Sequence, residues 1–143
     1  MRILLKNHHL VTLIPFLQGM KLKGERSRAR SKFLTLALEA YNALHESETE
    51  LLKDYAELDG KGDPVTAEDG GFILKRESAK ECLAEREKLF NEVAEIEGGT
   101  YWGHFAMMRK ILSEYDEELD GDNAALYDAL CDAFEESEAS HAR

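Results

Sequence analysis

The 143-residue sequence is poor in proline, cysteine and tryptophan, with two prolines, two cysteines and one tryptophan. It also lacks any apolar run near the roughly 20 residues that a membrane helix needs, so we expect no membrane association. Apolar residues make up 43% of the chain, which argues against a wholly disordered protein. At roughly 100–200 residues per domain, the length predicts a single domain over residues 1–143.

Basic residues are missing from one long segment near the C-terminus. Residues 111–142 contain eleven Asp or Glu and no Lys or Arg, and this segment accounts for the whole net charge of −11. Residues 21–32 have the opposite character, with six basic residues against Glu25 alone. The sequence is therefore a charge dipole, and each of the two segments is a candidate interaction surface.

The two cysteines and the N-terminal residues indicate in which cellular compartment the protein acts. Cys82 and Cys131 each lie in an apolar helical pattern, which predicts reduced thiols in a core rather than a disulfide or a metal site. The apolar run at residues 10–17 follows two basic residues, as in a signal peptide, but Pro15 interrupts the run and no small-x-small cleavage site follows. We therefore expect a cytoplasmic protein.

The spacing of apolar residues predicts a mainly α fold. A short strand is expected at residues 2–6 and a helix at residues 8–18, with Asn7 as its N-cap and Pro15 as a kink or an early end. Residues 93–97 fit either the end of the preceding helix or a strand that pairs with the first one. The sequence leaves both readings open.

A long antiparallel helical hairpin is the main predicted feature. Residues 25–58 contain neither Gly nor Pro and predict one helix of about 50 Å, whose polar middle at residues 45–50 leaves its continuity open. A second helix is expected at residues 77–92 and should pack against the first. Its residues expected to face inward are Ala79, Cys82, Leu83, Leu89, Phe90 and Val93. Between the helices, residues 66–74 predict a small β-hairpin with an Asp-Gly-Gly turn.

The remaining sequence predicts two shorter C-terminal helices. Apolar residues at helical spacing place one helix at residues 104–119 and another at residues 123–136. Residues 137–143 are expected to form a frayed tail.

The order of several segments resembles a known family. The segments that carry the resemblance lie at residues 21–24, 27–32, 51–56, 69–72, 91–96 and 115–130. Together they resemble a family of small uncharacterised proteins from phages and prophages of Gram-positive bacteria. The resemblance implies a phage-encoded accessory protein of unknown function, acting in the host cytoplasm or as a minor part of a virion. It implies no catalytic residues.

Two motifs invite a metal and are better explained otherwise. Residues 116–122 have carboxylates at loop positions one, three, five and seven and Gly at six, but Tyr127 stands at position twelve, where calcium needs a bidentate Glu. His8 and His9 are adjacent and so cannot share a helical face as metal ligands. We expect no metal, no cofactor and no small-molecule substrate.

The candidate interaction residues are Arg26, Arg28, Arg30, Lys32, Tyr101 and Trp102. The four basic residues occupy two neighbouring faces at the start of the long helix, where they could hold phosphates or pair with the acidic last third of the same or a neighbouring chain. The two aromatic residues lie in a Gly-rich loop that could form an interaction tip or cover the edge of the core.

Along the sequence, no nucleophile, base and orienting group come together. We therefore expect a non-enzymatic protein that acts through helix surfaces on a protein partner or by self-association, with particle assembly as a candidate role. Two alternatives stay open. One is nucleic-acid binding through residues 21–32, and the other is an acidic inhibitor in which residues 111–142 occupy a host protein that acts on nucleic acid.

Overall fold

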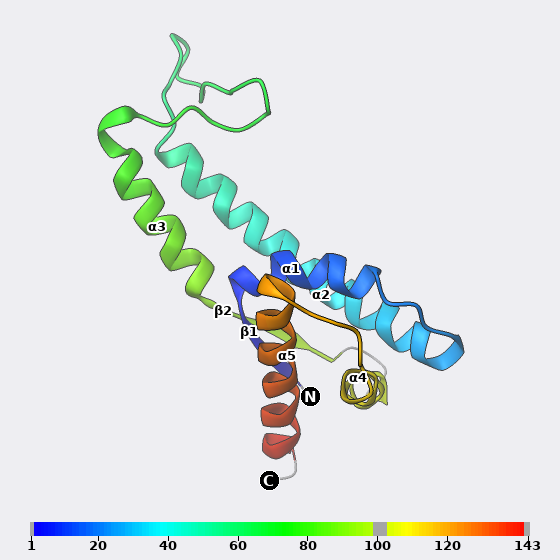
Figure 1. Ribbon diagram of the computed structural model, residues 1–143. Helices are drawn as coiled ribbons and strands as arrows, with labels where there is room; N and C mark the ends of the chain where they lie inside the picture. The colour runs from blue at the N-terminus through cyan, green and yellow to red at the C-terminus, as the bar shows by residue number, and fades with distance from the viewer. Residues whose placement is uncertain (1, 99–102, 142–143) are drawn as a thin grey trace. The chain divides into compact units, whose positions relative to one another are not determined.

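The computed structural model describes residues 2–98 and 103–141, with only the backbone of Ser140 and His141 (Figure 1). The chain forms two compact units, unit 1 with residues 1–41 and 93–143 and unit 2 with residues 42–92. Helix α2 (Gly24–Asp54) contributes to both units. One domain over the whole chain stays a prediction.

A two-stranded sheet lies within unit 1. Strands β1 (Arg2–Lys6) and β2 (Val93–Glu97) pair antiparallel, with Ile3 opposite Ile96. Because successive side chains point to opposite faces, these two isoleucines are buried while Leu4 and Val93 are exposed. The N-terminal strand is confirmed, and residues 93–97 form a strand rather than a helix end. Val93, predicted to face inward, is 60% exposed, because it begins the strand on its solvent face.

Helices enclose the core of unit 1. They are α1 (Asn7–Gln18), residues 24–41 of α2, α4 (Gly103–Ser113) and α5 (Gly121–His141). Helices α1 and α5 both lie against β1. The rings of Phe33, Phe105 and Phe134, from α2, α4 and α5, lie 5.5–5.9 Å apart between centroids. All three side chains are buried, as their helical spacing predicts.

Helix α1 differs from the prediction at its start and at its proline. It begins at Asn7, with Lys6 in the cap position and no side-chain cap bond, so the prediction of Asn7 as N-cap is wrong. Pro15 lies inside the helix and does not end it. Pro15 and Val11 are both exposed, so the backbone bond that proline cannot make is lost on the solvent side.

Helices α4 and α5 end elsewhere than predicted. Helix α4 ends at Ser113 instead of residue 119, because the acidic residues that follow are unfavourable at a helix C-terminus. Helix α5 continues to His141, five residues beyond the predicted helix end, and a frayed tail over residues 137–143 stays a prediction. Ser137 is buried, and Arg109 of α4 forms a surface ion pair with Glu138, which links the last turns of α5 to α4.

A helical hairpin makes up most of unit 2. Helix α3 (Ala79–Asn91), preceded by the short turn η1 (Arg76–Ser78), runs antiparallel to residues 42–54 of α2 (Figure 1). Arg86 pairs with Glu48 at 3.5 Å, and α2 is continuous through residues 45–50.

The prediction of which α3 residues face inward is only partly correct. Cys82 is fully buried, but Leu83, also expected inside, is 59% exposed. Adjacent helical positions point about 100° apart, so a neighbour of a central core residue is turned toward solvent.

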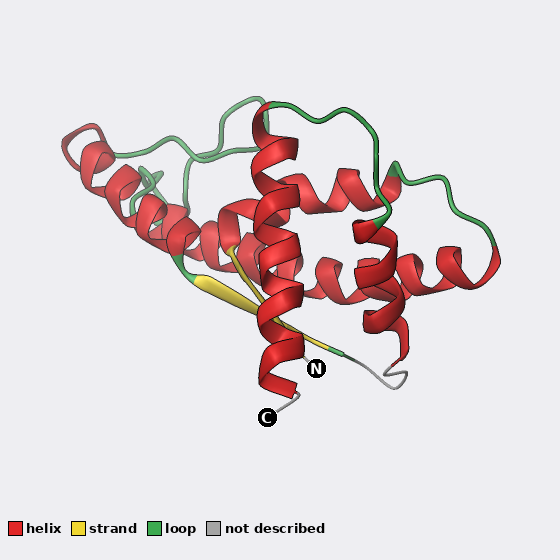
Figure 2. Cartoon of the chain, turned by 60° about the horizontal axis from the view of Figure 1, so that its bottom comes forward, coloured by secondary structure: helices red, strands yellow, loops and turns green. Residues whose placement is uncertain are grey.

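Three short extended segments follow α2, drawn as loops in Figure 2. Residues 56–58, 64–66 and 72–74 form three antiparallel bridges, each segment pairing with the other two. The predicted hairpin at residues 66–74 is one of these bridges and is confirmed. Helix α2 ends at Asp54, four residues before the predicted end, because the backbone of residues 56–58 pairs with the other two segments instead. We call these three mutually paired segments the ring of bridges.

The ring repeats its geometry every eight residues. The amides of Glu57, Val65 and Ile73 each bond to the carbonyl of another of these three residues, at 2.7–3.0 Å. Gly62 and Gly70 have φ of 84° and 86° at matching places in the two turns. Side chains strongly disfavour that conformation, so both turns need glycine.

Candidate interaction groove

A groove of about 860 Å³ opens in unit 1 where α1 ends, α2 begins and the loop of residues 114–120 joins α4 to α5. We call it the interaction groove. Its apolar lining comes from Phe16, Met20, Leu22, Ile111, Tyr115 and Leu119. Its basic side chains come from residues 21–26 and its acidic ones from residues 114–118, most of them exposed. The groove therefore has an apolar floor and a charged rim at the surface.

Arg30 holds one wall of the groove in place. Its guanidinium donates to the carbonyl oxygens of Leu17 and Met20, at 3.0 and 2.6 Å, and to Ser27 Oγ at 3.4 Å. The Leu17 carbonyl lies in the last turn of α1, where it also accepts from the Met20 amide, and Met20 follows the end of the helix. Arg30 thus ties the end of α1 to the first turns of α2.

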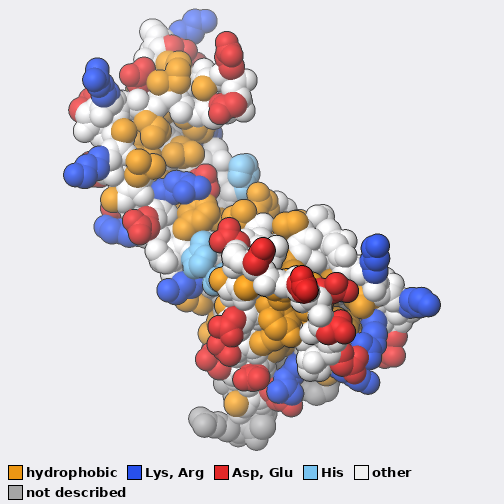
Figure 3. Space-filling view, viewed as in Figure 1, with side chains coloured by type: hydrophobic (Ala, Val, Ile, Leu, Met, Phe, Trp, Pro, Cys, Tyr) orange, Lys and Arg blue, Asp and Glu red, His pale blue; other side chains and the backbone are white. Residues whose placement is uncertain are grey.

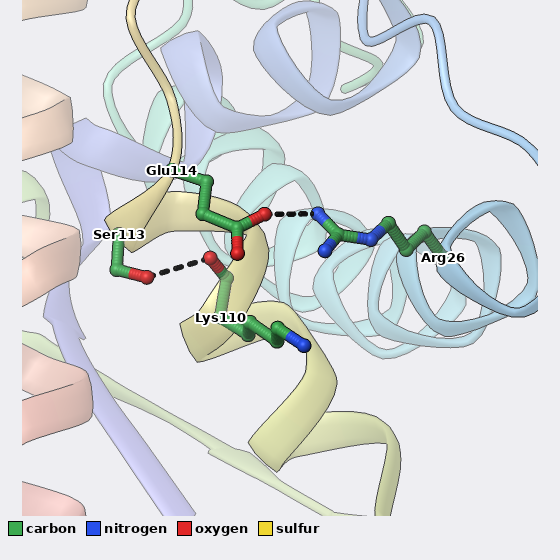
Figure 4. Close-up of polar contacts among 4 residues, drawn as sticks. All are labelled: Arg26, Lys110, Ser113 and Glu114. Carbon is green, nitrogen blue, oxygen red and sulfur yellow. Dashed lines mark hydrogen bonds and ion pairs between the residues drawn. The ribbon is translucent and has the colours of Figure 1, made fainter.

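Arg26 links α2 to the end of α4. Its Nη1 donates to Glu114 Oε2 at 2.6 Å, as Figure 4 shows. This hydrogen bond, with the charge attraction, lowers the pKa of the Glu114 carboxyl and raises the pKa of the Arg26 guanidinium. Nearby, Ser113 Oγ donates to the Lys110 carbonyl at 2.7 Å and closes the last turn of α4.

An aromatic row fixes the base of the acidic loop. The ring of Tyr115 lies 5.3 Å from that of Phe16 and 5.5 Å from that of Tyr127. The Tyr127 hydroxyl donates to the Leu112 carbonyl at 2.6 Å. Burial raises the pKa of both tyrosines, so they stay protonated near neutral pH. The loop thus starts from a point held by α1 and α5.

The predicted basic residues have different roles. Arg26 and Arg30 bond within unit 1, and Arg28 and Lys32 are exposed on the other face of α2. The prediction that the basic segment pairs with the acidic third of the same chain is confirmed for Arg26. Tyr101 and Trp102 lie outside the described residues.

The groove residues Phe16, Leu22 and Tyr115 were not predicted as a site. A sequence signal that could have found them is the opposite charge of the two segments that flank them, since these segments come together at the rim of the groove.

Neither cysteine has the setting of a reactive thiol. Cys82 and Cys131 are both free, and burial raises the pKa of each thiol. Cys131 lines a second, smaller cavity of about 380 Å³ between α4 and α5. A raised pKa lowers the thiolate fraction, so these thiols are poor nucleophiles at neutral pH.

The metal-like motifs do not form a cluster of metal ligands in the part of the chain that the structure describes. Rings of His8 and His9 lie 4.0 Å apart, and burial, followed by the charges of His8 and Lys6, lowers the pKa of His9. In residues 2–98 and 103–141, no three His, Cys, Asp or Glu side chains are grouped so that they could hold a metal ion. Within the same ranges, no helix combines the length and apolar character needed to cross a membrane.

Comparison with known proteins yields a family. Neither the curated proteins nor the solved structures gave a significant match to the chain. A family model described as protein of unknown function (DUF1617) matches residues 1–141, nearly the full length. The chain therefore belongs to the DUF1617 family.

Proposed function

We propose that this chain is a non-enzymatic interaction protein that binds a protein partner through the interaction groove. The observation that carries the proposal is the groove's apolar floor, open at the surface and bordered by charged residues. Stable protein interfaces have this organisation, with an apolar centre and a polar rim. The resemblance to phage and prophage proteins favours a role as an accessory protein, with particle assembly in the host cytoplasm as its setting.

The rigid walls support binding rather than catalysis. Arg26 and Arg30 hold the ends of α1 and α4, so a partner would meet a surface that is already ordered. Preorganisation reduces the entropy lost on association. The pKa of Tyr115 in the groove lining and of Tyr127 next to it is raised, which is the wrong direction for acid–base catalysis near neutral pH.

Site-specific photo-crosslinking tests the proposal. A photoreactive amino acid at Leu22, in the groove, should crosslink to a partner protein in lysate of induced host cells. The same amino acid at Val11, exposed on α1 outside the groove lining, is the matched control. Equal crosslinking from both positions, or none from Leu22, would contradict a groove-bound partner.

Exposed carboxylates on α5 favour a second candidate function, the acidic inhibitor. Asp128, Asp132 and Glu135 are exposed at helical spacing on α5, and Figure 3 shows acidic side chains over this helix. Such a face could take the place of a phosphate backbone on a host protein. Reversing these three charges to Lys should then abolish capture of that protein without unfolding the chain, and unchanged capture would refute this function.

A further inference from the structure

We infer that the groove receives a basic amphipathic peptide segment of the partner, with apolar side chains on the floor and Lys or Arg beside residues 116–118. This inference rests on the proposed function and adds the chemical class of the ligand. It follows from the shape of the groove, from its charges and from their distance to the floor.

The groove is shaped for a polypeptide rather than for an enclosed small molecule. Sites for small ligands bury most of the ligand surface. Here the charged lining residues Lys21, Glu117 and Glu118 are exposed, while the apolar lining residues Met20 and Ile111 are buried. A segment lying along the surface could place a few apolar side chains on this floor and keep its polar face in water.

Charge decides which segment fits. Arg26 and Glu114 neutralise each other at 2.6 Å. The remaining charges of the lining are the carboxylates of residues 116–118 against the single cation of Lys21. The rim therefore presents a net negative charge of two units to a ligand. An acidic peptide or a nucleic acid would meet like charge there, and a basic peptide opposite charge.

The carboxylates lie next to the floor in the sequence as well as in space. Asp116, Glu117 and Glu118 are flanked by Tyr115 and Leu119, which belong to the apolar lining. A peptide whose apolar side chains contact these two residues therefore brings its neighbouring side chains close to the carboxylates. At physiological salt the screening length is about 8 Å, so these nearby charges act on the ligand while distant ones are damped.

Fluorescence anisotropy with three short labelled peptides tests the inference. The first has a Leu and Trp face with Lys on the opposite face, the second carries Glu in place of each Lys, and the third carries Ser in place of each apolar residue. We expect the Lys peptide to bind and both others to bind at least about tenfold more weakly, because the groove offers both an apolar floor and negative charge.

Two charge-reversed variants separate the groove from general attraction to an acidic protein. Glu117→Lys with Glu118→Lys should weaken binding of the Lys peptide by about tenfold or more. Asp128→Lys with Asp132→Lys makes the same change in net charge on α5, outside the groove lining, and should leave binding within about twofold. Thermal unfolding of both variants checks that they fold.

Each other result overturns the inference. Equal weakening by both variants, or equal binding of the Ser peptide, would mean nonspecific charge attraction. Preference for the Glu peptide would mean that the ligand class is wrong. If no peptide binds, the inference fails, and crosslinking from Leu22 then shows separately whether the groove still binds a protein.

Discussion

Replacing Arg30 with Met tests whether the wall of the groove depends on one guanidinium. The Met side chain keeps much of the aliphatic length and removes the donors to the Leu17 and Met20 carbonyls. A hydrogen bond to a charged group contributes about 1.5–3 kcal/mol. Since Arg30 is only half-buried, water can replace part of this, and we expect a loss of about 2 kcal/mol for the two bonds together.

Chemical and thermal unfolding measure this loss. About 2 kcal/mol corresponds to a fall in Tm of about 6 °C for a chain of this size. Hydrogen exchange adds a local readout, because the amides at the end of α1 should exchange faster once the end of the helix is released. The matched control is Arg28→Met, exposed on the same helix, which should change stability by less than about 0.5 kcal/mol.

The outcome that would refute the reasoning is equal behaviour of the two variants. If Arg30→Met and Arg28→Met have the same stability and the same exchange at the end of α1, the guanidinium does not hold that wall. Arg30→Lys refines the test, because Lys keeps the charge but lacks the second guanidinium nitrogen that donates to Ser27 Oγ while Nη1 donates to both carbonyls. It should fall between the native chain and Arg30→Met.

Three further predictions concern the core, the ring of bridges and an ion pair. Phe33→Ala should cost about 3–5 kcal/mol in urea unfolding and Phe33→Leu less than about 2, since the ring is fully buried against two others; equal losses would contradict a packed cluster. Gly70→Ala, at φ 86°, should cost about 1–2 kcal/mol and speed exchange of the Val65 and Ile73 amides, whereas Gly60→Ala, in open space, should not. The pKa of Glu114 is lowered in the folded state, so its contribution to stability is present above the unfolded pKa and is lost as pH falls through the folded pKa. The difference in Tm between the native chain and Glu114→Gln should therefore shrink toward zero on acidification, and a difference that grows would contradict the ion pair.

Local pattern was enough to predict most helices. Phe33, Phe105 and Phe134 recur at helical spacing with their neighbours, and all three are buried where their helices meet. The strand at the N-terminus was also predictable, because its apolar run is too short for a helix before α1 begins. The sequence of residues 93–97 was ambiguous, because a segment of five residues fits both helical spacing and the alternation of a strand. Only pairing with β1 makes it a strand.

Helix ends and exposed apolar residues were harder to predict. Leu83 fits the apolar pattern of α3 yet faces solvent, since the pattern says which residues can be buried and not which have a neighbour. Helix α2 ends before Leu58 because the backbone there pairs with residues 64 and 74, beyond the reach of helical hydrogen bonds. The prediction of the end of α4 failed because apolar spacing continues to Leu119 while the intervening residues are acidic.

The sequence by itself determined the helical class, the N-terminal strand, the hairpin turn and the separation of charge. These follow from local periodicity, turn residues and composition, which need no knowledge of distant neighbours. The tertiary structure decided the ring of three bridges and the interaction groove. Phe16 meets Tyr115, and Arg26 meets Glu114, across about a hundred positions of sequence, and such contacts depend on how elements pack rather than on any local pattern.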